Sequence, residues 1–364
     1  MKPYVRNPLI TATMLPVDMV LAPSWWNRHA GISFDRDFFY HPLRRVEAEN
    51  QMEHVLYEKW GRFGLGADRE EQRPEIGPVH LAAGYLLQEM LGCRVAYAED
   101  QPPQVIPAEL ESLALDVDAA FKSPAYHAFC DLMARMGERH GYLTGDVNWS
   151  GVLNIALDLR GERLFMDRYD RPDEVDAMYA SIAEVIARFV QTIQKETGSS
   201  SISVNRTVRH IQQPVFLHSE CSHTMISAKD YEATLMPIDA AWSQRQRYRP
   251  FGIHYCGEDP HRFAASFAKL PHLDFLDVGW GGDVKVLREH LPNTFLNLRL
   301  SPVEIIEVGE DELASTIRRL VDESGNPWLT GICCINMDHQ VTDSKITAIY
   351  ETVESLRSEY ARSA

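Results

Sequence analysis

The sequence has few cysteines and no long apolar run, and both absences limit the class of protein it can be. Six cysteines, widely spaced in 364 residues, do not form a disulfide scaffold, so we expect reduced thiols and a cytoplasmic location. No run of 18 apolar residues occurs, which predicts no membrane span. The N-terminus lacks a basic segment followed by an apolar core, so no secretory signal is expected.

The chain also lacks an excess of positive charge and a glycine-rich phosphate loop. It has 36 Lys and Arg against 52 Asp and Glu, and its formal net charge of −16 argues against nucleic acid and anionic membranes as partners. No glycine-rich dinucleotide or phosphate motif follows a predicted strand, which disfavours an open, doubly wound nucleotide-binding sheet. Hydrophobic residues, at 45%, are sufficient for one large core.

Strand-like and helix-like segments alternate through the second half of the chain. Strands are predicted at 214–217, 251–256, 273–278, 294–298 and 328–335, and helices at 230–247, 261–268, 283–290, 310–322 and 342–360. Short connections between such segments predict parallel βαβ units. We therefore predict an α/β fold in which residues 1–364 form a single (β/α)8 TIM barrel. An open doubly wound sheet is the alternative.

The first half is less regular and predicts an elaborated helical N-terminal region. Helical stretches are expected at 38–60 and 112–140, and the turn-rich tract 99–103 is expected to be a loop. Neither this tract nor the serine-rich stretch near residue 200 is long enough to separate two domains.

One predicted strand carries two candidate metal ligands. His254 and Cys256 are separated by one residue, so on a strand both side chains point to the same side. Cys333, 77 residues after Cys256 and in a later predicted strand, is a third candidate. An imidazole and two thiolates suit zinc, and three protein ligands with an open position are typical of a catalytic site.

Two features of this ligand set stay open on the residues alone. Cys333 and Cys334 are neighbours, so only one of them can face inward, and the other is expected to pack under the helices as a small apolar residue. Asp277 ends the strand that follows the one with His254 and Cys256. Its carboxylate is either a weakly held fourth ligand or a cap for the next helix.

A dense group of ionisable residues follows another predicted strand. His218, Glu220 and His223 flank Cys221, and we interpret them as candidates for proton transfer at the mouth of the barrel. The alternative interpretation is a second metal half-site formed by Cys221 and His223.

Aromatic and polar residues in two further loops are candidates for substrate binding. Trp25 and Trp26 follow the first predicted strand, and Asp146, Asn148 and Trp149 lie in a second loop of the same kind. Tryptophans are usually packing residues, but at a barrel mouth they would form the wall of a flat or apolar pocket.

Four segments carry a resemblance to a known family. They are GYLTGDVNWSGVLNIALDLRGERLFMDRYDRPDEVD (141–176), PFGIHYCGED (250–259), LDFLDVGWGGDVKVLREHLP (273–292) and TGICCINMD (330–338). From about residue 20 onward the chain resembles the uroporphyrinogen decarboxylase superfamily, and within it the zinc-dependent, corrinoid-linked methyltransferases. The resemblance implies a (β/α)8 barrel with the site at the carboxyl ends of the strands. It also implies zinc held by His254, Cys256 and Cys333, with Asp277 as an additional ligand.

The resemblance implies methyl transfer between a small methylated compound or a thiol and cobalamin. The chain has no Asp-x-His-x-x-Gly cobalamin motif, so the cobalamin is expected on a separate corrinoid protein that docks over the barrel mouth. Metal-free decarboxylation of uroporphyrinogen is the second interpretation. The decarboxylases use an N-terminal tract rich in arginine, whereas residues 24–31 here contain a single arginine, Arg28. A non-catalytic zinc-stabilised binding protein is the third, and it would need four closed ligands.

Overall fold

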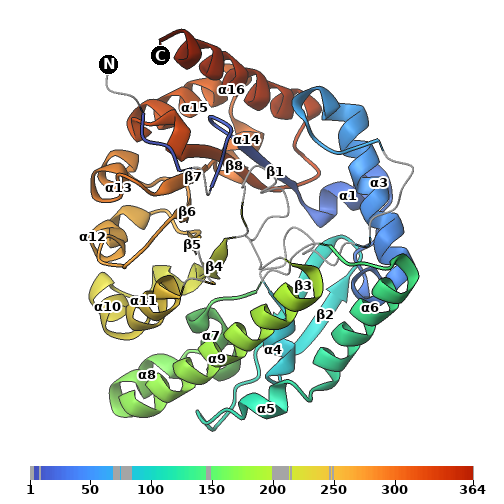
Figure 1. The fold of residues 1–364 in the computed structure, drawn as a ribbon, viewed down its shortest axis with the longest axis vertical. Coiled ribbons are helices and arrows are strands. Elements are labelled where there is room, and N and C mark those ends of the chain that lie inside the picture. Colours follow the sequence, from blue (N-terminus) through green and yellow to red (C-terminus); the bar gives the residue numbers. More distant parts are fainter. Residues whose placement is uncertain are drawn as a thin grey trace.

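The computed structural model describes residues 4–7, 10–68, 74, 84–144, 149–198, 213, 215–245, 247 and 250–363. Its central element is a parallel sheet of six strands in the order β1-β8-β7-β6-β5-β4. The strands are β1 (Val17–Leu21), β4 (Phe216–Ser219), β5 (Phe251–Tyr255), β6 (Phe275–Val278), β7 (Phe295–Arg299) and β8 (Thr330–Met337). The sheet curls, and helices lie along its outer side (Figure 1).

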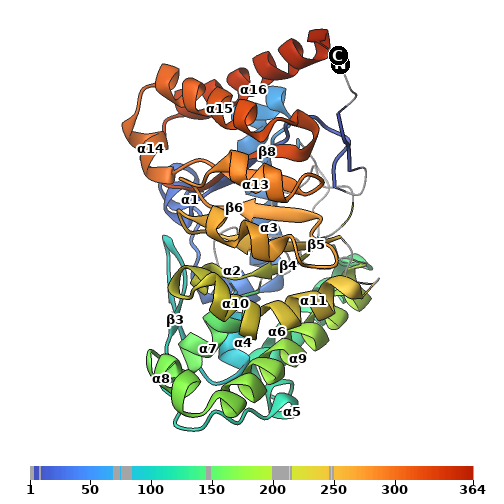
Figure 2. The same cartoon turned by 90° about the vertical axis from the view of Figure 1, so that its left-hand side faces the viewer.

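Helices connect successive strands of this sheet. They are α10 (Ala228–Thr234) and α11 (Met236–Gln244) after β4, α12 (Ala264–Phe267) after β5, α13 (Val284–His290) after β6, α14 (Pro302–Glu307) and α15 (Glu310–Ser324) after β7, and α16 (Asp343–Ser363) after β8. In the turned view, α10, α11 and α13 lie in front of β4, β5 and β6 (Figure 2). Because the strand order follows the chain order from β4 to β8, the sheet is wound in one direction, like a barrel wall, and is not doubly wound.

The N-terminal half is mostly helical, as expected. Its helices are α1 (Pro23–Ala30), α2 (Arg36–Tyr40), α3 (Pro42–Trp60), α4 (Leu86–Met90), α5 (Val117–Ala120), α6 (Pro124–His140), α7 (Val152–Arg160), α8 (Arg163–Asp170) and α9 (Pro172–Thr197). An antiparallel hairpin of β2 (Arg94–Ala98) and β3 (Gln101–Ile106) lies between α4 and α5. The tract predicted as a loop at 99–103 is therefore only partly turn, because β3 begins at Gln101.

The α/β prediction is confirmed, and the described strands form a curled half-barrel. Its extension to eight strands and the single-domain organisation of residues 1–364 stay predictions. Within the described residues, no helix combines the length and apolar character that crossing a lipid bilayer requires.

Side chains on the inner face of the sheet form layers, because neighbouring parallel strands are in register. The layer nearest the amino ends of the strands is apolar and contains Leu217, Gly252, Phe275 and Phe295. The next layer contains Ser219, His254, Asp277, Asn297 and Gly331. Above them, Arg299, Cys333 and Asp18 are in register at the carboxyl side. Polarity on the inner face therefore rises toward the end of the sheet where barrel enzymes hold their sites.

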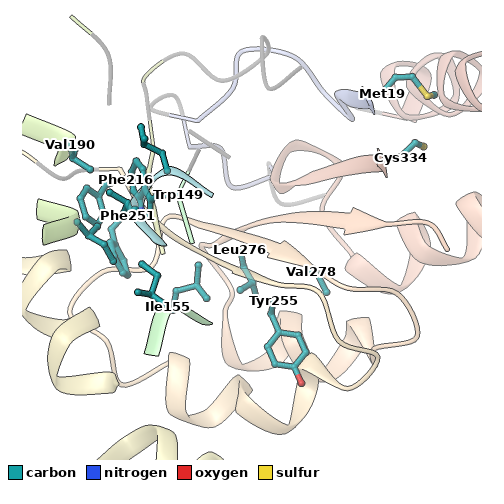
Figure 3. Packing of buried hydrophobic residues seen from close by; sticks show 14 of the residues in the cluster. Met19, Trp149, Ile155, Val190, Phe216, Phe251, Tyr255, Leu276, Val278 and Cys334 are labelled. Atoms are coloured by element: carbon teal, nitrogen blue, oxygen red, sulfur yellow. The ribbon is translucent and has the colours of Figure 1, made fainter. Parts of the chain in front are cut away.

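The outer face of the sheet carries the main hydrophobic core beneath the helices. Its members include Phe216, Phe251, Tyr255, Leu276 and Val278 (Figure 3). Cys334 belongs to this core and pairs in register with Met19. Cys333 instead clusters with Val20 and Ile335 on the inner face. The prediction that these neighbouring cysteines face opposite sides is confirmed.

Candidate metal centre

Three candidate ligands meet at the carboxyl ends of β4 and β5. The ligand atoms of Cys221, His254 and Cys256 all lie within 4.8 Å of one another. His254 belongs to β5, Cys256 follows its last residue, and Cys221 begins a 3₁₀ turn after β4. Ser219 of β4 is in register with His254 of β5. Cys221 and Cys256 each lie two positions further along the sequence from these residues, and they therefore come together.

A carboxylate behind His254 fixes the orientation of its ring. His254 Nδ1 lies 2.7 Å from Asp277 Oδ2, so Nε2 is the ring nitrogen that remains for a metal ion. Asn297 Nδ2 donates to Asp277 Oδ1 at 3.3 Å and to Asp18 Oδ2 at 2.9 Å. Among the described residues, Asp277 therefore supports a ligand from behind and does not belong to the three-ligand group.

A buried arginine completes the polar surroundings of His254. The Arg299 side chain is only 2% exposed, and its Nη2 lies 3.2 Å from Asp277 Oδ2. The same Nη2 is 3.3 Å from His254 Nδ1. Arg299 Nη2 and His254 Nδ1 therefore both contact Asp277 Oδ2, and these two contacts hold the Asp277 side chain in place.

Two buried polar atoms of the inner face have no hydrogen-bond partner within the described part of the chain. They are Arg299 Nε and Ser219 Oγ. Buried polar groups are normally satisfied by protein, water or ligand. Unpartnered atoms beside His254 fit a site that takes a polar ligand better than they fit a sealed core.

The two neighbouring thiols differ in their ionisation. The hydrogen bond from Cys221, together with His254 and Arg299, lowers the pKa of Cys256 to about 4 against the opposing effect of burial. The same hydrogen bond raises the pKa of Cys221 well above its ordinary value. Burial raises the pKa of Asp277, but the charges of Arg299 and His254 outweigh it and the net shift is downward. Cys256 is therefore the more acidic thiol of the pair.

The structure brings together two of the four predicted metal ligands, His254 and Cys256, and adds Cys221, which the sequence analysis considered only for an alternative half-site with His223. Cys333 faces inward in register with Arg299, but among the described residues it lies outside the three-ligand group. Its role as a ligand stays a prediction. Cys221 could have been found from the sequence, because it continues the inward parity of Ser219 two positions beyond the strand.

His218 and Glu220 face away from this cluster and hold the start of α7. His218 Nδ1 lies 2.7 Å from Asp239 Oδ1, and Nε2 lies 3.4 Å from Glu220 Oε2. Glu220 accepts from the backbone N–H groups of Leu153 at 2.7 Å and Asn154 at 3.1 Å. A Cβ at Gly151 would lie 2.4 Å from Glu220 Oε2, so only glycine allows this approach. Both residues have a structural task, and their role in proton transfer stays a prediction.

His223 lies in an aromatic cage on the outer side of the sheet. Its ring packs against Tyr231, Tyr255, Phe263 and Phe267. Neither ring nitrogen has a hydrogen-bond partner among the described residues. Burial lowers the pKa of His223 well below its ordinary value, so the neutral form of the ring is favoured. This position is separate from the three-ligand group.

The predicted substrate-binding tryptophans lie in the core. Trp25 is fully buried and Trp26 is 1% exposed, and their ring centroids are 5.0 Å apart. Trp149, also 1% exposed, packs on Phe216 with ring centroids 5.4 Å apart. These indoles pack in the core, and none of them lines the open pocket at the ends of β1 and β8. Their role in substrate binding stays a prediction. Asp146 and Asn148 lie outside the described residues.

An open pocket of about 990 Å³ lies at the carboxyl ends of β1 and β8. Its lining includes Arg28, Asp100, Asn336 and Asp338. Asn336 has a positive φ of 59°. It lies at a β-bulge in β8, where the pairing shifts between Met19 and Leu21 of β1. Bulges of this kind re-aim side chains near functional sites, and this one brings an amide to the pocket.

Comparison with known proteins gives a likeness in structure and none in sequence. No protein-family model matches the chain, and no curated protein matches it significantly. A methyltransferase from Methanosarcina mazei is similar in structure, with a TM-score of 0.63 and 12% identity over 95% of this chain and 95% of that one. A B12-independent methionine synthase from Shewanella sp. W3-18-1, in complex with selenomethionine, has a TM-score of 0.51 and 10% identity over 96% and 100%. At such low identities, the likeness concerns the fold.

Proposed function

We propose that this chain is a zinc-dependent methyltransferase. It moves a methyl group between a small methylated compound or a thiol and the cobalamin of a separate corrinoid protein. The observation that carries the proposal is the group of Cys221, His254 and Cys256, whose ligand atoms lie within 4.8 Å of one another. The fold shared with a protein described as a methyltransferase supports the same reaction class.

The residues at the site fit a zinc ion. Two thiols and one imidazole are preferred zinc donors, and three donors leave a fourth position for substrate. The hydrogen bond between His254 Nδ1 and Asp277 is the usual support of a metal-binding histidine. Zinc bound there would act as a Lewis acid, stabilising negative charge on a departing atom or keeping an acceptor thiol ionised at neutral pH.

The chain's own residues would hold the ion and direct its open side. Cys221, His254 and Cys256 would bind the ion, and Asp277 keeps the His254 ring in place. The apolar layer of Phe275 and Phe295 closes the interior below them, so a substrate would approach a bound ion from the carboxyl ends of the strands. In the transfer itself, the nucleophile's electron pair forms the new bond to the methyl carbon as the bond to the leaving atom breaks. The leaving atom keeps that bond's pair, and no oxidant is needed.

We propose that the corrinoid protein docks over the carboxyl-end face of a complete eight-stranded barrel, in the cytoplasm. The chain's lack of a cobalamin motif supports a separate carrier. The pocket at the ends of β1 and β8 opens at this end of the sheet. Decarboxylation of uroporphyrinogen is less well supported, because Arg28 shares that pocket with the carboxylates of Asp100 and Asp338.

The proposal is tested with purified, zinc-loaded protein, methylcobalamin and a set of small thiols. We expect loss of the methylcobalamin spectrum together with thioether formation, and no such activity in His254→Ala. Cys334→Ser, altered on the outer face, serves as the matched control that retains activity. A zinc-loaded protein that converts uroporphyrinogen to coproporphyrinogen and transfers no methyl group would contradict the proposal.

A further inference from the structure

Arg299 is the only fixed positive charge that the described structure places directly against His254 and Asp277 on the inner face. Its guanidinium charge also interacts with the thiols of Cys221, Cys256 and Cys333. The side chain is 2% exposed, and its Nε has no hydrogen-bond partner among the described residues. Burying a cation next to a metal-binding cluster costs free energy unless a nearby negative charge compensates it.

The charges around the site explain what Arg299 contributes. A divalent ion with two thiolates and a neutral imidazole is electrically neutral. Asp277, whose Oδ2 lies 2.7 Å from His254 Nδ1, adds a negative charge behind this ligand, and that charge would disfavour an anionic fourth ligand. Arg299, paired with Asp277 at 3.2 Å, cancels that charge. Asp277 can therefore orient His254 without its charge repelling an anionic ligand.

We propose that Arg299 makes the open position of the metal centre selective for an anionic ligand. The substrate atom that enters there is then a thiolate, phenolate or alkoxide, and not a neutral amine nitrogen. This inference rests on the proposed zinc site and narrows its substrate class. Arg299 acts through charge and is a positioning residue, since it is not itself among the three ligands.

The experiment uses the full chain loaded with Co²⁺, whose absorption spectrum reports each added ligand. Dissociation constants are measured for 2-mercaptoethanol, which binds as a thiolate, and for imidazole, which binds as a neutral molecule. In Arg299→Met we expect thiolate affinity to fall about tenfold or more and imidazole affinity to change by less than about threefold. Arg299→Lys, which keeps the charge, should retain the preference for thiolate.

Co²⁺ affinity, measured by competition with a chelator, separates this electrostatic role from a merely structural one. Removing a cation beside the metal should leave Co²⁺ affinity unchanged or raise it. If Arg299 only held Asp277 and His254 in place, Co²⁺, thiolate and imidazole would all bind more weakly in Arg299→Met. That result, or an unchanged ratio of thiolate to imidazole affinity, would overturn the inference.

Two further variants keep the test decisive. Arg288→Met is the matched control, because Arg288 donates to the carbonyls of Leu291, Thr294 and Leu329 away from the cluster and should lose stability with no change in ligand preference. Arg299→Gln retains a donor for Asp277 if the methionine variant does not fold, and it should show the same loss of thiolate preference. A wild type that binds no Co²⁺ would overturn the metal site itself, whereas a wild type with normal metal and unchanged variants would overturn only the role of Arg299.

Discussion

Side-chain parity along the strands decides which single residues reach the candidate metal centre. It correctly predicts from the sequence that His254 and Cys256 lie together and that Cys333 and Cys334 face opposite sides. Parity applied beyond the end of β4 would also have predicted Cys221. Arg299 carried a weaker signal, a charge at the end of an apolar strand. Its contact with Asp277 spans two strands and depends on the direction of a long flexible side chain, which the sequence does not specify.

The identity of the third ligand is a prediction at the residue scale. Cys221→Ser should lose most of the zinc affinity, because a hydroxyl is a far weaker zinc ligand than a thiolate. Cys333→Ser should lose less, since Cys333 is outside the three-ligand group within the described residues. Zinc affinity of each variant is measured by competition with a chelator, and Cys334→Ser is the control that keeps zinc. A larger loss in Cys333→Ser would restore the ligand set implied by the family resemblance.

Asp18 predicts a pH dependence of stability. Burial raises its pKa to about 7 from an ordinary value of 3.8, although the hydrogen bond from Asn297 opposes the shift. Between these values the folded chain holds a proton that the unfolded chain releases, so the free energy of unfolding falls as pH rises from about 4 to about 7. Asp18→Asn removes this loss, and above pH 7 it should be more stable than wild type by about 2–4 kcal/mol. Urea unfolding at several pH values measures the difference, and a difference that stays constant with pH would refute the assignment.

Among the elements, the strands of the second half follow their predicted ranges closely, because short apolar runs between turn residues leave few alternatives. The helix expected at 230–247 is divided into α10 and α11, since Pro237 lacks an N–H group and begins a new helix. Helix α14 was not predicted, although Ser301 and Pro302 are an N-cap and first-turn signal. The β2–β3 hairpin was missed because Pro102 and Pro103 are unusual inside a strand.

His218, which contacts the start of helix α7, and His223 are predicted to contribute differently to the stability of the fold. His218→Phe leaves the buried Asp239 Oδ1 without the His218 Nδ1 contact at 2.7 Å and the Val152 N–H without its acceptor, and should lower the free energy of unfolding by about 3 kcal/mol. His223→Phe should be neutral or stabilising by about 1 kcal/mol, because the ring already lies among aromatic side chains without hydrogen bonds. Chemical denaturation measures both. A destabilised His223→Phe variant, or one that folds normally and loses methyl transfer, would assign His223 a polar role instead.

For the whole molecule, the alternation of strands and helices was enough to predict a parallel sheet wound in one direction. It was not enough to predict the packing of the N-terminal helices, which places Trp25 and Trp26 in the core instead of at a pocket. Tryptophan suits both places, and only the three-dimensional position of α1 decides between them. The open pocket is lined instead by polar residues from separate segments, including Arg28, Asp100 and Asn336.

The most direct test of the central claim is zinc-edge X-ray absorption on purified protein whose zinc content has been measured. The three-ligand group predicts about one zinc per chain, with two sulfur neighbours at about 2.3 Å and one imidazole nitrogen at about 2.0 Å. The fourth neighbour should be a light atom in the resting protein and a third sulfur after a thiol is added. A protein that binds no zinc on reconstitution, or one with four protein ligands that no thiol changes, would contradict a catalytic zinc site.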